Sequence, residues 1–162
     1  KLRYAIGQIS GVNSVHSLRT RKIGQLISCD VHVQVDPYLS VSEGHIISVS
    51  VERVAKECLE DLSDVTVHID PEDDEMVAPY ETLPERAEAL GILTRALFNN
   101  KCDGEIERIQ LHYLDSRIHV DFYLPLSCLE SDQSSDEILA KLHTTVDALE
   151  GFGRIKVYFS KD

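Results

Sequence analysis

The sequence predicts an α+β protein made of two small domains in tandem, each with the order helix, strand, strand, helix, strand. Strict alternation of apolar and polar residues, clearest from Leu26 to Val35, predicts half-buried strands. Apolar residues that recur at steps of three and four predict the helices. The acidic, proline-containing stretch 73–83 is typical of a linker, and the same order of elements occurs before it, in residues 1–72, and after it, in residues 84–162. We therefore expect two open-faced sheets that contain antiparallel strands and bury one face under helices.

Each half supplies five segments with the required periodicity. In the first half these are a helix near Leu2 to Ile9, a strand near Val12 to Arg19, the strand Leu26 to Val35, a helix from Val41 to Leu62 and a strand from Asp64 to Asp70. In the second half they are a helix from Pro84 to Asn99, strands at Ile106 to Tyr113 and Ile118 to Leu124, a helix from Asp136 to Leu149 and a strand from Arg154 to Phe159. Gly24 and the pair Asp115-Ser116 are placed to turn antiparallel hairpins.

Three helix starts carry the capping-box pattern, in which a hydroxyl and a carboxylate bind each other's backbone amides. The pattern occurs at Ser40 to Glu43, Thr82 to Glu85 and Ser134 to Glu137. These matches support three of the expected boundaries.

Composition narrows the class of partner. The chain has 162 residues, 43% of them hydrophobic, and a net charge of -12. This negative charge disfavours binding to nucleic acid and anionic lipid and favours binding to cations. No apolar run approaches the roughly 20 residues that cross a bilayer, so we expect no membrane insertion by this segment. Because the chain opens at Lys1 without an initiator Met, we expect a fragment of a longer protein.

Histidines and one aspartate in the first half form a metal-type pattern. His32 lies on the polar face of one predicted strand, and His68 and Asp70 share the polar face of another. His45 points about 160° away from the buried stripe of its helix, on the scale of roughly 100° per residue, so it is not a core histidine. The direction of His16 does not follow from strand parity. Imidazoles with a carboxylate suit zinc, and also iron, manganese, cobalt or nickel.

Four segments of the first half resemble the cytoplasmic C-terminal domain of cation diffusion facilitator transporters. They read GVNSVHSLRTRKIGQ, DVHVQVD, SVSEGHIISVSVE and DVTVHIDPED. The resemblance implies a ferredoxin-like, metallochaperone-like domain of αββαβ order, homodimerisation, and attachment to the transmembrane domain of the same full-length chain at the cytoplasmic face of a membrane. It also implies divalent cation binding, with zinc first and Fe²⁺, Mn²⁺, Co²⁺, Ni²⁺ or Cd²⁺ as alternatives. Carried over residue by residue, the metal positions are His16, His32, His45, His68 and Asp70.

The second half is expected to be a degenerate copy without this pattern. Alignment of the apolar faces puts Tyr158 at the place of His68, Ser160 at that of Asp70 and Gln110 at that of His16. Arg108, Arg154 and Lys156 on its polar face would repel a divalent ion. We expect this face to pack against another sheet, in the same chain or in a homodimer. For His112, His119 and His143 we expect solvated side chains without a metal.

The function expected from the sequence is metal sensing and dimerisation in the cytosolic part of a divalent-cation efflux transporter, without enzyme activity. No nucleophile with a base, glycine-rich phosphate loop or catalytic carboxylate pair stands out. The alternatives are a metal-independent structural dimerisation module and a soluble metallochaperone. The absence of exposed Cys ligands counts against a copper chaperone.

Overall fold

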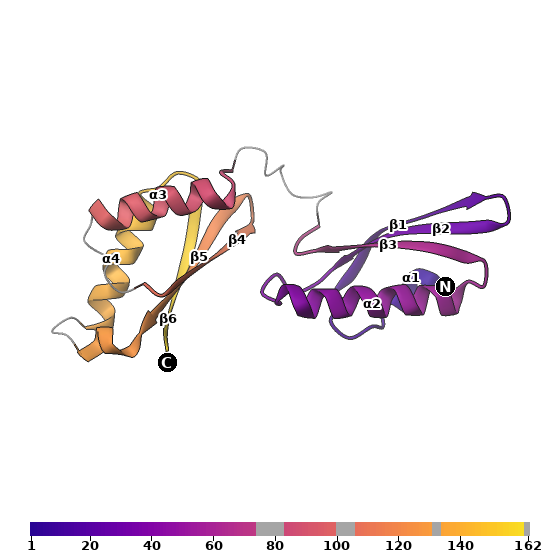
Figure 1. Ribbon diagram of the computed structural model, residues 1–162, viewed down its shortest axis with the longest axis horizontal. Coiled ribbons are helices and arrows are strands. Elements are labelled where there is room, and N and C mark those ends of the chain that lie inside the picture. The colour runs from indigo at the N-terminus through magenta and orange to yellow at the C-terminus, as the bar shows by residue number, and fades with distance from the viewer. Residues whose placement is uncertain (74–82, 100–105, 131–133, 161–162) are drawn as a thin grey trace. The chain divides into compact units, whose positions relative to one another are not determined.

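The computed structural model describes residues 1–73, 83–99, 106–130 and 134–160, which divide into two compact units, Lys1–Val77 and Ala78–Asp162 (Figure 1). The predicted linker lies almost wholly outside the described residues. In the described residues no helix is both long enough and apolar enough to cross a membrane.

The first unit is a three-stranded sheet covered on one face by two helices (Figure 1). Its elements are α1 (Leu2–Ile6), β1 (Ser14–Ile23), β2 (Leu26–Gln34), α2 (Val41–Cys58) and β3 (Leu62–Asp70). The strand order is β1-β2-β3, with β1 antiparallel and β3 parallel to the central strand. The hairpin between β1 and β2 turns at Gly24, whose φ of 66° favours glycine.

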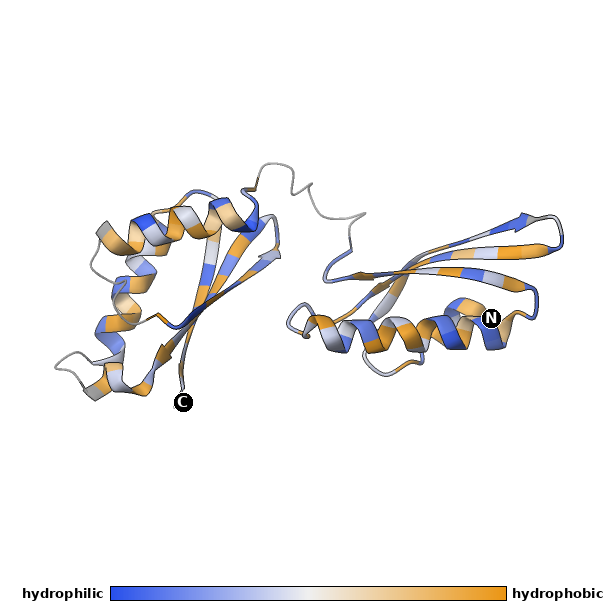
Figure 2. Ribbon diagram, viewed as in Figure 1, coloured by the Kyte–Doolittle hydropathy of each residue, from blue (hydrophilic) through white to orange (hydrophobic). Residues whose placement is uncertain are grey.

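Alternation along β2 separates the core of this unit from an open polar face (Figure 2). Cys29, Val31 and Val33 are buried on the helix side, where they meet Ile47 and Val51 of α2. The residues that follow each of them, Asp30, His32 and Gln34, lie on the other face. The core therefore fixes which side chains the sheet presents on its uncovered face.

The second unit repeats this topology. Its elements are α3 (Arg86–Asn99), β4 (Arg108–Leu114), β5 (Arg117–Pro125), the 3-10 helix η2 (Leu126–Glu130), α4 (Ser135–Asp147) and β6 (Phe152–Ser160). The order is β4-β5-β6, with one antiparallel and one parallel pairing around β5. Ala89 and Leu93 of α3 and Leu142 of α4 pack on Val120 and Phe122 of β5. The predicted α+β class and the αββαβ order are confirmed for both units.

Two of the three capping boxes are present. Ser40 and Ser134 each accept from the amide three residues on, and the carboxylates of Glu43 and Glu137 accept from the cap amides. The backbone N–H and the hydroxyl of Ser40 both donate to the Glu43 carboxylate, which holds the pKa of this exposed carboxyl below its ordinary value, and slight desolvation opposes them. Thr82 lies outside the described residues.

Candidate metal centre

A β-bulge in β1 decides where His16 points. Val15 pairs with Val33, but the next paired residue is Ser17, opposite His32, so His16 is the extra residue between them. A bulge interrupts strict alternation and re-aims a side chain. As a result, His16 lies on the same polar face as His32 and Asp70.

Both imidazoles approach one carboxylate oxygen. His16 Nε2 lies 3.1 Å and His32 Nδ1 lies 3.0 Å from Asp70 Oδ2. Asp70 is positioned by the parallel pairing of β2 with β3, in which Gln34 faces Asp70 and His32 faces His68. The side chains of His16, His32 and Asp70 are 7%, 31% and 12% exposed, so the cluster is largely shielded from water.

Both ring nitrogens of His16 lack a hydrogen-bond partner among the described residues, although they are buried. The 3.1 Å approach of Nε2 to Asp70 meets the distance of an ion pair but not the geometry of a hydrogen bond. An unsatisfied buried polar group costs about 1–3 kcal/mol. In the neutral ring one of the two nitrogens carries no proton, so its lone pair is available to a ligand.

The donor set fits a divalent transition metal. Across the described ranges, His16, His32 and Asp70 form the one group of three such side chains whose ligand atoms lie within 4.8 Å of one another. Two imidazole nitrogens and one carboxylate oxygen supply three ligands of a tetrahedral zinc site and leave a fourth position open. Imidazole and carboxylate also suit iron and manganese, so these donors do not select one metal.

His68 borders this cluster without entering it. Its ring stacks on that of His32, with the centroids 4.1 Å apart and the planes 4° from parallel. The two histidines therefore share the polar sheet face, as their strand periodicity predicted. The exposed ring of His68 lies beside the three-residue cluster.

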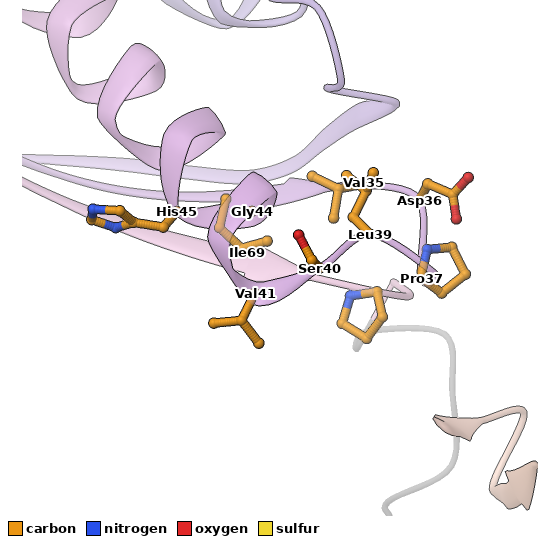
Figure 3. Close-up of a pocket in the computed structure, with 10 residues that line it drawn as sticks. Val35, Asp36, Pro37, Leu39, Ser40, Val41, Gly44, His45 and Ile69 are labelled. Carbon is orange, nitrogen blue, oxygen red and sulfur yellow. The ribbon is translucent and has the colours of Figure 1, made fainter. Parts of the chain in front are cut away.

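His45 lies on a different element and is exposed, as the helical periodicity predicted. It lines a hollow of about 410 Å³ at the start of α2, together with Gly44, Val41 and Ile69 (Figure 3). His45 is not a member of the His16–His32–Asp70 group. The structure thus brings four of the five predicted residues to one sheet face and leaves His45 on α2.

The corresponding face of the second unit holds an aromatic stack. Tyr123 and Tyr158 pair across β5 and β6 as His32 and His68 pair in the first unit, and their ring centroids lie 5.0 Å apart. The guanidinium carbon of Arg108 lies 3.8 Å from the centroid of Tyr123. A fixed cation therefore occupies the face that carries imidazoles in the first unit.

One sequence-based equivalence is wrong. Arg108 pairs with Tyr123 as Ser17 pairs with His32, so the counterpart of His16 is Glu107 and not Gln110. Glu107 Oε2 accepts from Ser160 Oγ at 3.3 Å, in the place of the contact between His16 and Asp70. The register of β4 with β5 runs without a shift from Arg108 to Leu114.

The expectation of solvated histidines is also wrong for two of the three. His112 and His119 are buried, whereas His143 is exposed on α4. His112 Nε2 lies 3.1 Å from Asp121 Oδ2, and both side chains are 8% exposed. A polar side chain on an open sheet face becomes buried when its neighbours cover it, and alternation alone does not reveal this.

The comparisons with known proteins concern mainly the first unit. Residues 1–72 match a family model described as the cytoplasmic domain of cation efflux proteins. The chain is 27% identical over 160 residues to Metal tolerance protein C1 of Arabidopsis thaliana, a match that covers 92% of this chain and 34% of that protein. It is 37% identical over 68 residues to Metal tolerance protein 2 of Oryza sativa subsp. japonica, covering 42% of this chain and 18% of that protein. The chain thus spans about a third or less of the length of these relatives.

Solved structures with similarity to this chain include MamM CTD structures. One, described as a manganese form, has 28% sequence identity and a TM-score of 0.42, and the match covers 44% of this chain and 90% of that chain.

Proposed function

Because residues 1–72 belong to the family of cation efflux protein cytoplasmic domains, we propose that this chain senses a divalent cation and dimerises in the cytosolic part of an efflux transporter. The observation that carries the proposal is the buried His16, whose ring nitrogens have no hydrogen-bond partner in the described part of the chain. A metal ion at His16, His32 and Asp70 would bind the unprotonated ring nitrogen of His16 and neutralise the buried carboxylate of Asp70. The family is one of transporter domains and not of enzymes.

The first coordination sphere in this proposal is His16, His32 and Asp70, with His68 as an adjacent fourth donor from the exposed side. Zinc is the first candidate, and Fe²⁺, Mn²⁺, Co²⁺, Ni²⁺ and Cd²⁺ are alternatives. His45 serves a second ion or the site of a partner subunit, because it is exposed and lies on α2.

A second copy of the chain is the proposed partner. Near His45, α2 exposes Val41, Ile46 and Val49, which are 93%, 64% and 47% exposed. Apolar side chains on the outer side of a helix are stabilised when another surface covers them. In an acidic chain, bound cations also reduce repulsion between two copies, so metal binding would favour association. In the full-length transporter, closer copies would bias the transmembrane part toward transport.

The test combines zinc titration calorimetry with mass measurement by light scattering. The wild type is compared with the double variant His32→Ala/His68→Ala and with His143→Ala, whose side chain is exposed on α4. We expect zinc binding and a zinc-dependent rise in mass in the wild type and in His143→Ala, and loss of both in the double variant. Equal binding by all three proteins would contradict the proposed ligands.

The alternative is a metal-independent dimerisation module, and one contact favours it. His32 already hydrogen-bonds Asp70 at 3.0 Å, so the carboxylate is paired without an ion. In this case the wild type would be a dimer at submicromolar concentration with or without zinc, and the double variant would have the same mass.

A further inference from the structure

A β-bulge in the second unit places one histidine against the backbone of a neighbouring strand. Ile118 pairs with Phe152 and Val120 with Ile155, so Gly153 and Arg154 of β6 both face the single residue His119 of β5. A bulge removes one residue from the ladder of strand hydrogen bonds. A backbone amide there needs another acceptor if it is shielded from water.

His119 supplies that acceptor. The backbone N–H of Arg154 donates to His119 Nδ1 at 2.8 Å. Because an accepting ring nitrogen carries no proton, the neutral ring holds its hydrogen on Nε2. Nε2 is buried without a hydrogen-bond partner among the described residues, and Oδ2 of Asp115 lies 3.9 Å away, beyond hydrogen-bond distance.

Gly153 allows the ring of His119 to lie against β6. A Cβ atom at Gly153 would lie 2.5 Å from Nδ1 and 2.6 Å from Cε1 of His119. These distances are below any normal contact, so only glycine fits beside the imidazole. A side chain at position 153 would therefore displace the ring from the Arg154 amide.

We propose that His119 makes the second unit acid-sensitive: a proton on Nδ1 opposes the N–H of Arg154, breaks this bond and loosens β6 from β5. Two donors would then face each other at the bulge. The inference involves no metal and stands independently of the proposed function.

Burial and most of the charges around His119 disfavour a proton on its ring. Burial is the largest cause that lowers the pKa of His119, and the positive charge of Arg154 is the next. Asp115 raises the pKa, whereas His112 and Arg117 lower it. Asp121, which also lies on β5, is paired with His112 at 3.1 Å.

The sign of the pH dependence follows from this lowered pKa. The unfolded chain binds a proton to this imidazole at higher pH than the folded chain does, so stability falls as the pH falls below the ordinary histidine value of about 6.5. A single such proton changes the unfolding equilibrium by up to about tenfold per pH unit, until the folded form is also protonated.

The first unit contains the same bulge without an imidazole. Ile27 pairs with Leu62 and Ser28 with Asp64, so Ser28 occupies the position of His119. Here the hydroxyl of Ser63 donates to the Ile27 carbonyl at 3.1 Å. A hydroxyl does not titrate near neutral pH, so this contact keeps its form over the same pH range.

Hydrogen exchange of the full chain, with a chelator present, tests the proposal. Amide protection in peptides of β6, corrected for the intrinsic effect of pH, is followed from pH 7.5 to pH 5. The variant His119→Asn retains an acceptor near the position of Nδ1 and cannot take up a proton, and His143→Asn removes an exposed imidazole from the same unit.

We expect the wild type and His143→Asn to lose protection in β6 by up to about tenfold per pH unit below pH 6.5, and His119→Asn to lose markedly less. An equal slope in all three proteins would overturn the proposal. A second measurement is nuclear magnetic resonance of the His119 imidazole in the wild type, which does not depend on the folding of a variant. Titration of that ring near pH 6.5, without a change at the Arg154 amide, would also overturn it.

Discussion

Replacement of His16 by Ala distinguishes between two roles of this residue, as a metal ligand and as a packing residue. A structural zinc site with four ligands contributes about 10–16 kcal/mol, so one ligand is worth about 3 kcal/mol and its loss raises Kd about 100-fold. The effect on the metal-free protein is expected to be small. The lost packing of a side chain that is 7% exposed is offset by the removal of two buried nitrogens that have no hydrogen-bond partner among the described residues, each of which costs about 1–3 kcal/mol.

The assay measures zinc affinity by competition with a chromophoric chelator and metal-free stability by urea unfolding. We expect His16→Ala to weaken zinc binding about 100-fold and to change the free energy of unfolding by less than about 1 kcal/mol. The control His143→Ala should change neither. A loss of about 2 kcal/mol or more in metal-free stability with unchanged zinc affinity would show that His16 is a packing residue and would refute the reasoning.

Three further predictions concern the fold. Ser40→Ala removes the capping contacts with Glu43 and should lower the free energy of unfolding of the first unit by about 1 kcal/mol in chemical unfolding. An unchanged free energy of unfolding would show that the cap does not stabilise the helix. Burial and the nearby charge of Asp30 raise the pKa of the Cys29 thiol. Alkylation at pH 7.5 should therefore be slower at Cys29 than at the partly exposed Cys58. Equal alkylation rates of the two thiols, measured by mass spectrometry, would contradict this. Ile118→Val removes a buried methylene and should cost the second unit about 0.5–1.5 kcal/mol, with zinc affinity unchanged in the same sample.

Strand alternation predicted most of the fold because one face of each sheet is buried. The run from Leu26 to Val35 became β2 almost residue for residue, since its core residues are 0–4% exposed. The helix after it ends at Cys58 and not at Leu62. Leu59 is extended, with φ -138° and ψ 107°, and Leu62 begins β3, so the apolar period continues after the helical backbone has ended.

The candidate site was predictable where alternation holds and not where it breaks. The shared face of His32 and His68 follows from the period of two and the parallel pairing of their strands. The direction of His16 depends on the bulge between Val15 and Ser17, which no residue type in that stretch signals. In the second unit, the buried His119 depends on a bulge at Gly153, for which an isolated glycine within a strand is the available signal.

The most direct test of the metal-sensing account is anomalous X-ray diffraction from crystals of the zinc-loaded chain, with data collected on both sides of the zinc absorption edge. The account predicts a zinc peak about 2.0–2.2 Å from a ring nitrogen of His16, a ring nitrogen of His32 and a carboxylate oxygen of Asp70. A zinc peak elsewhere, without contact to any of these three side chains, would contradict it.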